Sequence, residues 1–202
     1  MTQETEYEDT KKKLLSTGIR VGTEVKTKFM MPYITQTSSD GLYLFDLDIT
    51  LSRIQTAAKF IKKFDIKKVI VYSGRSYAMT PIEKFCELTG AEKMVGRFMP
   101  GTLTNPSLPY YSEPHLILVS DPQVDAQAIT EAANAGVPVI GIANTDNVTS
   151  KLDLVIPAYN RGRKALATIY WLLASEILQD SKAMKYEIDD FETKTAEVEE
   201  EL

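Results

Sequence analysis

The chain has 202 residues, of which 44% are hydrophobic and 25% are charged, so we expect one domain with a substantial buried core. No run of about 18 apolar residues occurs, so we expect neither a membrane-spanning helix nor a secretory signal. The single cysteine, Cys86, excludes a disulfide within the chain. With His115 as the only histidine, we expect no metal site and no cofactor, as in a protein of the reducing cytoplasm.

Charge is unevenly distributed along the chain, although the net charge is −5. Residues 1–9 contain four acids and no base, and residues 181–202 contain eight acids and three lysines. The remaining residues, 10–180, hold 20 basic and 16 acidic side chains, a net charge of +4. We therefore expect a flexible N-terminal segment (1–13), a mildly basic folded domain (14–180) and an acidic, disordered tail (181–202). A mildly basic domain is compatible with RNA binding but not diagnostic of it.

Short apolar segments alternate with segments of helical periodicity in the folded part. The apolar segments predict strands buried on both faces: residues 42–47, 68–72, 116–119, 137–142 and 152–156. The helical patterns cover residues 51–64, 80–89, 126–135 and 165–177. Residues 80–83 (TPIE) have the layout of a capping box with proline at the first helical position. The alternation predicts an α/β fold with a single doubly wound, Rossmann- or flavodoxin-like parallel sheet and helices on both faces.

Two aspartates lie at the end of the first predicted strand and just after it, in the segment LYLFDLDITL. An apolar strand followed by Asp-x-Asp-x-Thr resembles the first motif of haloacid-dehalogenase-type phosphatases. That resemblance implies Asp46 as the nucleophile and Asp48 as the acid/base, with magnesium neutralising the phosphate. It would also make Ser73 a phosphate-holding hydroxyl.

Three observations count against this phosphatase interpretation. Ile49 stands where those enzymes usually have glycine. Asp121 and Asp125 would be the metal-binding acids that end the phosphatase motif set, but no lysine other than Lys93 precedes them in the expected place. The motif also leaves residues 18–34 and 97–105 unexplained. The simpler hypothesis is that Asp46 and Asp48 cap the following helix, and that Asp121 and Asp125 support a strand-to-helix turn.

Residues 97–105 (RFMPGTLTN) predict a loop with binding groups but no general base. Four prolines between residues 99 and 114 disfavour a helix there. A guanidinium and several hydroxyl and amide groups suit contacts with phosphate and ribose oxygens. The alternative is an internal turn network in which threonine and asparagine satisfy backbone groups. The candidate RNA-binding residues of this loop are Arg97, Thr102, Thr104 and Asn105.

Other basic residues are candidates for phosphate contacts. A helix N-terminus disfavours cations, so a cluster of bases at the start of the last predicted helix suggests an anionic partner. Arg75 follows a predicted strand in an SGR turn, and the most basic early stretch precedes the first strand. These candidates are Arg20, Lys26, Lys28, Arg75, Arg161, Arg163 and Lys164.

Residues 97–105 also resemble the signature loop of the small-subunit ribosomal protein S2 family, whose eukaryotic members are called ribosomal protein SA or laminin-receptor precursor. Further segments occur in the order and spacing of that family: 18–34 (GIRVGTEVKTKFMMPYI), 121–125 (DPQVD), 136–142 (GVPVIGI), 144–146 (NTD) and 153–160 (DLVIPAYN). The resemblance covers about residues 14–178. The chain departs from the family where Arg20 replaces the usual histidine and Asp48 replaces a common lysine.

The resemblance implies a non-enzymatic protein of the small ribosomal subunit. It implies binding to small-subunit ribosomal RNA near the head–body junction, contacts with neighbouring ribosomal proteins, a role in translation in the cytoplasm, and no small-molecule substrate. Bacterial members carry a long helical, coiled-coil insertion, for which the fifteen residues between Asn105 and Asp121 leave no room. With a tail shorter than the eukaryotic extension, the chain resembles the archaeal branch.

Overall fold

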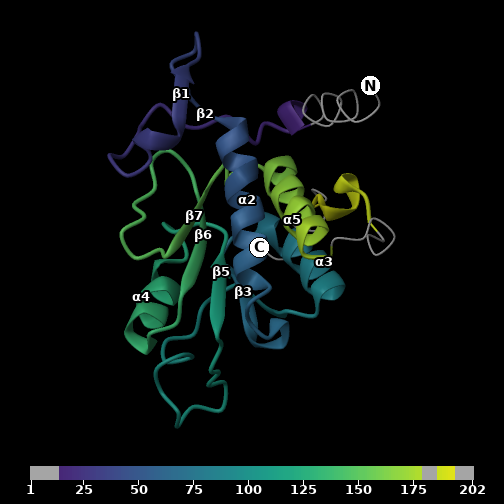
Figure 1. Cartoon of the computed structure of the whole chain (residues 1–202). Coiled ribbons are helices and arrows are strands. Elements are labelled where there is room, and N and C mark those ends of the chain that lie inside the picture. The colour runs from purple at the N-terminus through teal and green to yellow at the C-terminus, as the bar shows by residue number, and fades with distance from the viewer. Residues whose placement is uncertain (1–13, 179–185, 194–202) are drawn as a thin grey trace.

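A five-stranded parallel sheet forms the centre of the computed structural model, which describes residues 14–178 and 186–193. The strands are β3 (Val69–Ser73), β4 (Glu92–Val95), β5 (Leu116–Val119), β6 (Val139–Ala143) and β7 (Leu154–Pro157). Their order in the sheet is β4-β3-β5-β6-β7 (Figure 1). Counted from β3, this is the order 2-1-3-4-5 of flavodoxin-like doubly wound folds. The predicted α/β architecture is therefore confirmed.

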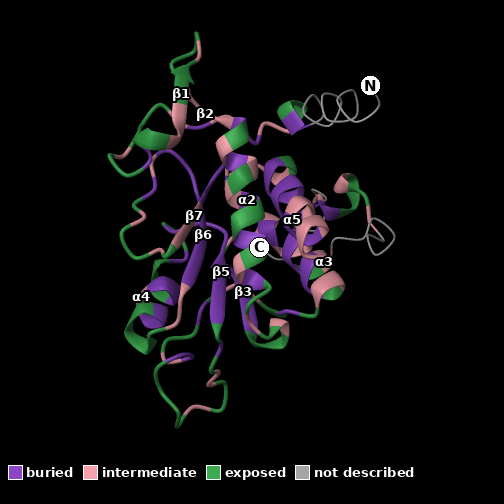
Figure 2. Cartoon of the chain, in the orientation of Figure 1, coloured by how far each residue is buried: buried purple, intermediate pink, exposed green. Residues whose placement is uncertain are grey.

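Helices cover both faces of the sheet. They are α2 (Leu47–Ile61), α3 (Met79–Thr89), α4 (Ala126–Ala135) and α5 (Arg163–Leu178). Strand residues alternate between the faces, so Val71 and Leu118 pack with α2, α3 and α5, whereas Tyr72 and Val119 pack with α4. The three inner strands, β3, β5 and β6, are completely buried between these layers (Figure 2). None of the helices in the described ranges is long and apolar enough to cross a bilayer.

The loop that joins β4 to β5 replaces a helix on the α4 face. Phe98 and Leu103 are buried in the same cluster as Ile129 of α4. The ring of Phe98 meets that of Tyr72 edge to face, with centroids 5.2 Å apart. The loop is thus part of the hydrophobic core on one side and surface on the other.

The first predicted strand does not join the parallel sheet, which corrects the sequence-based topology. The predicted strand (42–47) contains β2 (Tyr43–Phe45), which pairs in antiparallel fashion with β1 (Ile34–Thr37). An isolated β-bridge also joins Val21 to Leu44. A turn over residues 38–41, in which Gly41 has a φ of 83°, reverses the chain direction. The strand after the turn therefore pairs with the strand just before it, as a two-stranded hairpin. Phe45 anchors the hairpin by packing on Met30 and Ala143.

Two further differences concern elements near β3. Strand β4 was not predicted, because its sequence, EKMV, places two exposed charged residues on a sheet edge and lacks an apolar run. Helix α3 begins at Met79 after the short 3-10 helix η3 (Ser76–Ala78), and its N-cap, Ala78, makes no side-chain cap bond. Thr80 therefore lies inside the helix, and the capping-box prediction is wrong.

Part of the expected disordered tail is folded onto the domain. The 3-10 helix η4 (Ile188–Phe191) packs against α5, and Phe191 is completely buried there. Trp171 donates its indole N–H to the carbonyl of Tyr186, and Thr193 donates its hydroxyl to the carbonyl of Tyr77. The prediction of disorder is therefore corrected for residues 186–193, since aromatic side chains give this acidic segment an apolar anchor. Residues 1–13, 179–185 and 194–202 lie outside the described residues.

Candidate nucleic-acid interface

Asp46 and Asp48 lie at the start of α2 as helix-capping acids. Asp46 is the N-cap, and its carboxylate accepts hydrogen bonds from the backbone N–H of Asp48 at 2.9 Å and of Ile49 at 3.4 Å. Asp48 is exposed in the first turn, where a carboxylate interacts favourably with the helix dipole. The capping hypothesis is confirmed for Asp46. Among the described residues, no group of three or more acidic, histidine or cysteine side chains could hold a metal ion.

The switch point of the sheet, between the carboxyl ends of β3 and β5, is filled by the protein's own side chains. Ligands commonly bind at this place in doubly wound sheets. Here the guanidinium of Arg75 forms an ion pair with the buried Asp121 and donates to the Tyr77 hydroxyl at 2.7 Å. Asp125 accepts from the N–H groups of Gly74 at 2.8 Å and Asp121 at 3.0 Å. Asp121 and Asp125 therefore support the turns, as predicted, and Arg75 is engaged inside the protein.

The charge state of Asp125 depends on its burial. Burial raises the pKa of the Asp125 carboxyl to about 7. Repulsion from Asp121 adds to this rise, while the hydrogen bonds from Gly74 and Asp121 and the attraction of Arg75 oppose it. The network at the switch point is thus sensitive to pH near neutrality.

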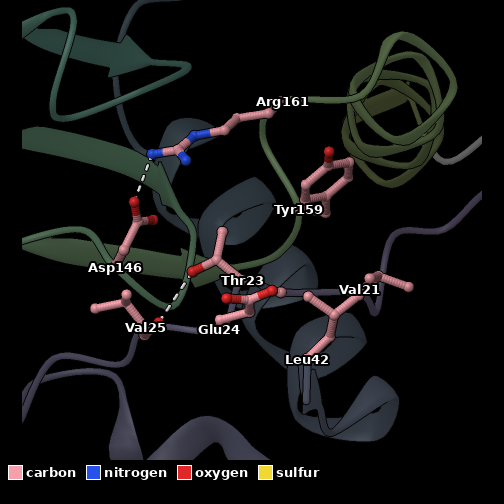
Figure 3. Close-up of a pocket in the computed structure, with 9 residues that line it drawn as sticks. Val21, Thr23, Glu24, Val25, Leu42, Asp146, Tyr159 and Arg161 are labelled. Carbon is pink, nitrogen blue, oxygen red and sulfur yellow. Dashed lines mark hydrogen bonds and ion pairs between the residues drawn. The ribbon is translucent and has the colours of Figure 1, made fainter. Parts of the chain in front are cut away.

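A cleft of about 490 Å³ lies beside the carboxyl ends of β6 and β7 (Figure 3). On its wall, Arg161 donates to the carboxylate of Asp146 at 2.6 Å and to the side chain of Gln123 at 3.0 Å. Glu24 adds a second carboxylate to the lining. The lining contains two carboxylates and one guanidinium, which Asp146 already neutralises, so this cleft disfavours phosphate. Arg161, a predicted phosphate contact, is instead part of an internal ion pair.

Four of the predicted cations are exposed at the carboxyl end of the sheet: Lys26, Lys28, Arg97 and Lys164. Lys26 lies against the Tyr43 ring, and we call the other three the carboxyl-end surface: Lys28, Arg97 and Lys164. Lys28 follows Thr27, which hydrogen-bonds to the turn after β6, and Lys164 lies in the first turn of α5. Arg97 follows Gly96, whose N–H donates to Ser73 O at the end of β3. Within the described residues, none of these three cations forms an ion pair.

The remaining predicted cations, Arg20, Lys26 and Arg163, lie on the same side of the molecule, and each contacts the protein near its own position. Arg20 donates its Nε–H to Phe45 O at 2.9 Å, and the ammonium of Lys26 lies 4.5 Å from the centroid of the Tyr43 ring. Arg163 is half-buried at the start of α5. These side chains have less freedom to reach an external phosphate than the carboxyl-end surface.

The loop after β4 is fixed by a buried acid that sequence reasoning missed. Glu131 of α4 accepts from the N–H groups of Gly101 at 2.8 Å and Leu103 at 3.3 Å. Its role was not visible in the sequence because about thirty residues separate it from the loop. Thr102 is buried, and its hydroxyl donates to Met99 O, so its prediction as a surface contact is wrong.

Thr104 and Asn105 remain exposed on the far side of this loop. Asn105 accepts from the N–H of Ser107 at 3.1 Å, which gives a local turn as well as an accessible amide. The loop therefore has both features that its sequence suggested. Its buried side forms an internal hydrogen-bond network, and its solvent-facing side carries exposed polar groups.

Comparison with known proteins places this arrangement in one family. The model of the family described as Ribosomal protein S2 matches residues 14–108 and 109–180. The chain belongs to the ribosomal protein S2 family.

Members from archaea resemble the chain over most of its length. It is 67% identical to the small ribosomal subunit protein uS2 of Nitrosopumilus maritimus, over 98% of this chain and 99% of the relative. It is 59% identical to the protein of the same name from Cenarchaeum symbiosum, over 90% of each chain. The protein of that name from Thermofilum pendens is 52% identical, over 82% of this chain and 77% of the relative.

The S2 family assignment decides between the two interpretations of the Asp46 region. Ribosomal protein S2 is a structural, non-enzymatic protein, and Asp46 has the matching structural role of a helix cap. The archaeal affinity also agrees with the loop after β4, which reaches β5 through turns with no helical insertion over residues 97–115.

Proposed function

We propose that this protein binds small-subunit ribosomal RNA through the loops at the carboxyl end of its sheet, as a structural component of the small ribosomal subunit that supports translation. The family and its archaeal members, named small ribosomal subunit protein uS2, support the ribosomal structural role. The RNA-binding loops are our proposal.

Arg97 carries this proposal. It is exposed, forms no ion pair with any described residue, and begins a loop that Glu131 and the buried Phe98 hold in place. A loop that is already ordered loses little conformational entropy when it binds. Arg75 and Arg161, by contrast, are neutralised by Asp121 and Asp146. Among the described residues, the exposed cations at this end without an ion pair are therefore those of the carboxyl-end surface, together with Lys26 beside the Tyr43 ring.

Recognition by these groups should follow shape and backbone charge. Arginine and lysine bind phosphate oxygens without reading the bases, and the exposed Thr104 and Asn105 can hydrogen-bond to 2′-hydroxyls. Exposed apolar side chains near the same end suit neighbouring ribosomal proteins rather than RNA: Val25, Phe29, Met31 and Val148.

The test is the salt dependence of binding to purified small-subunit ribosomal RNA. We expect Arg97→Gln with Lys164→Gln to reduce the slope of log K against log salt by about 0.7 to 0.9 for each phosphate that the variant no longer neutralises. The control is Lys93→Gln with Lys151→Gln, which removes the same charge from exposed sites on other elements. Equal slopes for the two double variants would exclude these residues from the interface.

A further inference from the structure

Five lysines cluster at the C-terminal end of α2 and just beyond it, and none of them is among the candidates predicted from the sequence. We call them the lysine end: Lys59, Lys62, Lys63, Lys67 and Lys68. All five are exposed, and Asp65 is the only acid between residues 59 and 68. The dipole of α2 favours cations in its last turn, which accounts for the first lysines. It does not account for Lys67 and Lys68, which lie beyond α2 in the 3-10 helix η2 (Ile66–Lys68).

No described carboxylate neutralises the lysine end. Within residues 14–178 and 186–193, none of its five ammonium groups lies within 4.0 Å of a carboxylate. The carboxylate of Asp65 instead caps η2 by accepting from the N–H of Lys67 at 3.2 Å. The ammonium of Lys68 lies 3.4 Å from Nε2 of His115, a neutral group that can accept its hydrogen bond but does not cancel its charge. The five ammonium groups carry the same charge within ten residues and repel one another, and an anionic partner would remove that repulsion.

The lysine end and the carboxyl-end surface lie at opposite ends of the sheet. Helix α2 begins beside the hairpin, where Asp46 N–H donates to Tyr33 O, and ends where η2 leads into β3 (Figure 1). A helix of 15 residues is about 22 Å long. That distance exceeds the Debye length of about 8 Å at physiological salt, so the two groups of cations act as separate electrostatic sites.

We propose that the lysine end binds the phosphate backbone of a second RNA segment, distinct from the segment at the carboxyl-end surface. This inference rests on the proposed function, because it takes the same RNA as its ligand. Ammonium groups bind phosphates as point charges. The nearby rings of Phe60 and Phe64 are half-buried and pack on each other edge to face at 5.2 Å, so they offer no stacking platform for a base. The contact is therefore electrostatic and insensitive to sequence.

The first experiment measures binding of the full chain to purified small-subunit ribosomal RNA between about 50 and about 200 mM salt. The test variant is Lys63→Gln with Lys67→Gln, and the control is Lys93→Gln with Lys151→Gln, which has the same net charge. In the test variant only, we expect the slope of log K against log salt to fall by about 0.7 to 0.9 for each phosphate left without its lysine. A test variant that behaves like the control would overturn the proposal.

Combination with the carboxyl-end variant separates this inference from the proposed function. If both sites bind RNA, the slope changes of the Arg97/Lys164 and Lys63/Lys67 variants add in the quadruple variant. A change of slope in the Lys63/Lys67 variant alone would contradict the carboxyl-end proposal and support RNA binding by the lysine end. A change of slope in the Arg97/Lys164 variant alone would support the carboxyl-end proposal and contradict RNA binding by the lysine end.

Lysine acetylation of the purified complex gives an independent readout. RNA should protect Lys62, Lys63, Lys67 and Lys68 from the reagent, while Lys151 reacts at the same rate with and without RNA. The competing occupant is the chain's own acidic C-terminus. The proposal would be overturned if the acetylation rate of these four lysines were the same with and without RNA and rose after deletion of residues 194–202. That result would show that the acidic residues of the deleted segment cover the lysine end.

Discussion

At the scale of single residues, the acids of this protein support turns and helix ends. Asp46 illustrates the limit of a motif: Asp-x-Asp-x-Thr after a strand fits a phosphatase, yet its carboxylate bonds to the first N–H groups of α2. The capping role of Asp46 could be predicted from the sequence because capping follows local rules. The ion pair of Arg75 with Asp121 could not be predicted, since it joins residues 46 positions apart.

The cap makes a quantitative prediction for Asp46. Asp46→Ala should lower the free energy of unfolding by about 1 kcal/mol, because two backbone N–H groups of α2 lose their acceptor. Asp46→Asn should be nearly neutral, since asparagine also accepts at an N-cap. Urea denaturation of the two variants and the parent measures both values. Equal destabilisation by alanine and asparagine would show that the cap bond is not the source of stability.

Asp125 gives the protein a predicted dependence on pH. The folded-state pKa of about 7 lies above the ordinary aspartate value of 3.8, so the folded state binds the proton more tightly than the unfolded state does. The contribution of this group to stability is therefore present below about pH 4 and is lost as pH rises to about 7, by an amount on the order of 3 kcal/mol.

Asp125→Asn removes the titrating group while keeping its shape. We expect the free energy of unfolding of this variant, measured by urea denaturation from about pH 4 to about pH 7, to fall less with pH than that of the parent. Parallel pH profiles would mean that Asp125 is ionised throughout this range.

At the scale of elements, local patterns predicted the apolar strands and failed where a strand is charged or pairs outside the parallel sheet. Strands β3, β5 and β6 were found because burial on both faces requires continuous apolar sequence, and the edge strand β7 was found because its sequence, LVIP, is also a continuous apolar run. Strand β4 has charged residues on an open edge, and β2 turns back into a hairpin. Both outcomes depend on tertiary pairing, which a local pattern does not contain.

The C-terminal segment shows the same dependence on tertiary contact. Its acidic composition predicted disorder, but Phe191 is fully buried beside the ring of Tyr186, with centroids 6.4 Å apart. Phe191→Ala should therefore lower the free energy of unfolding by about 3 to 5 kcal/mol. The exposed Asp189→Ala, in the same 3-10 helix, should change it by less than about 0.5 kcal/mol. Similar small values for both variants would show that residues 186–193 contribute nothing to the stability of the domain.

At the scale of the whole molecule, the sheet separates two exposed groups of cations. Loop composition and the bases at the start of the last helix led to candidates at the carboxyl end, where the structure leaves Lys28, Arg97 and Lys164 without an ion pair among the described residues. They gave no reason to select the lysines at the end of α2 and beyond it, although these form a dense basic segment of the sequence. Counting charge along a sequence does not show which cations are neutralised inside the fold.

The central claim is that this chain is a structural component of the small ribosomal subunit, held there by contacts with RNA. The most direct measurement is sedimentation of cell lysate through a sucrose gradient, followed by detection of the protein in each fraction. The account predicts that the protein migrates with the small subunit and remains there through moderate salt. Migration at the top of the gradient as a free monomer would contradict it.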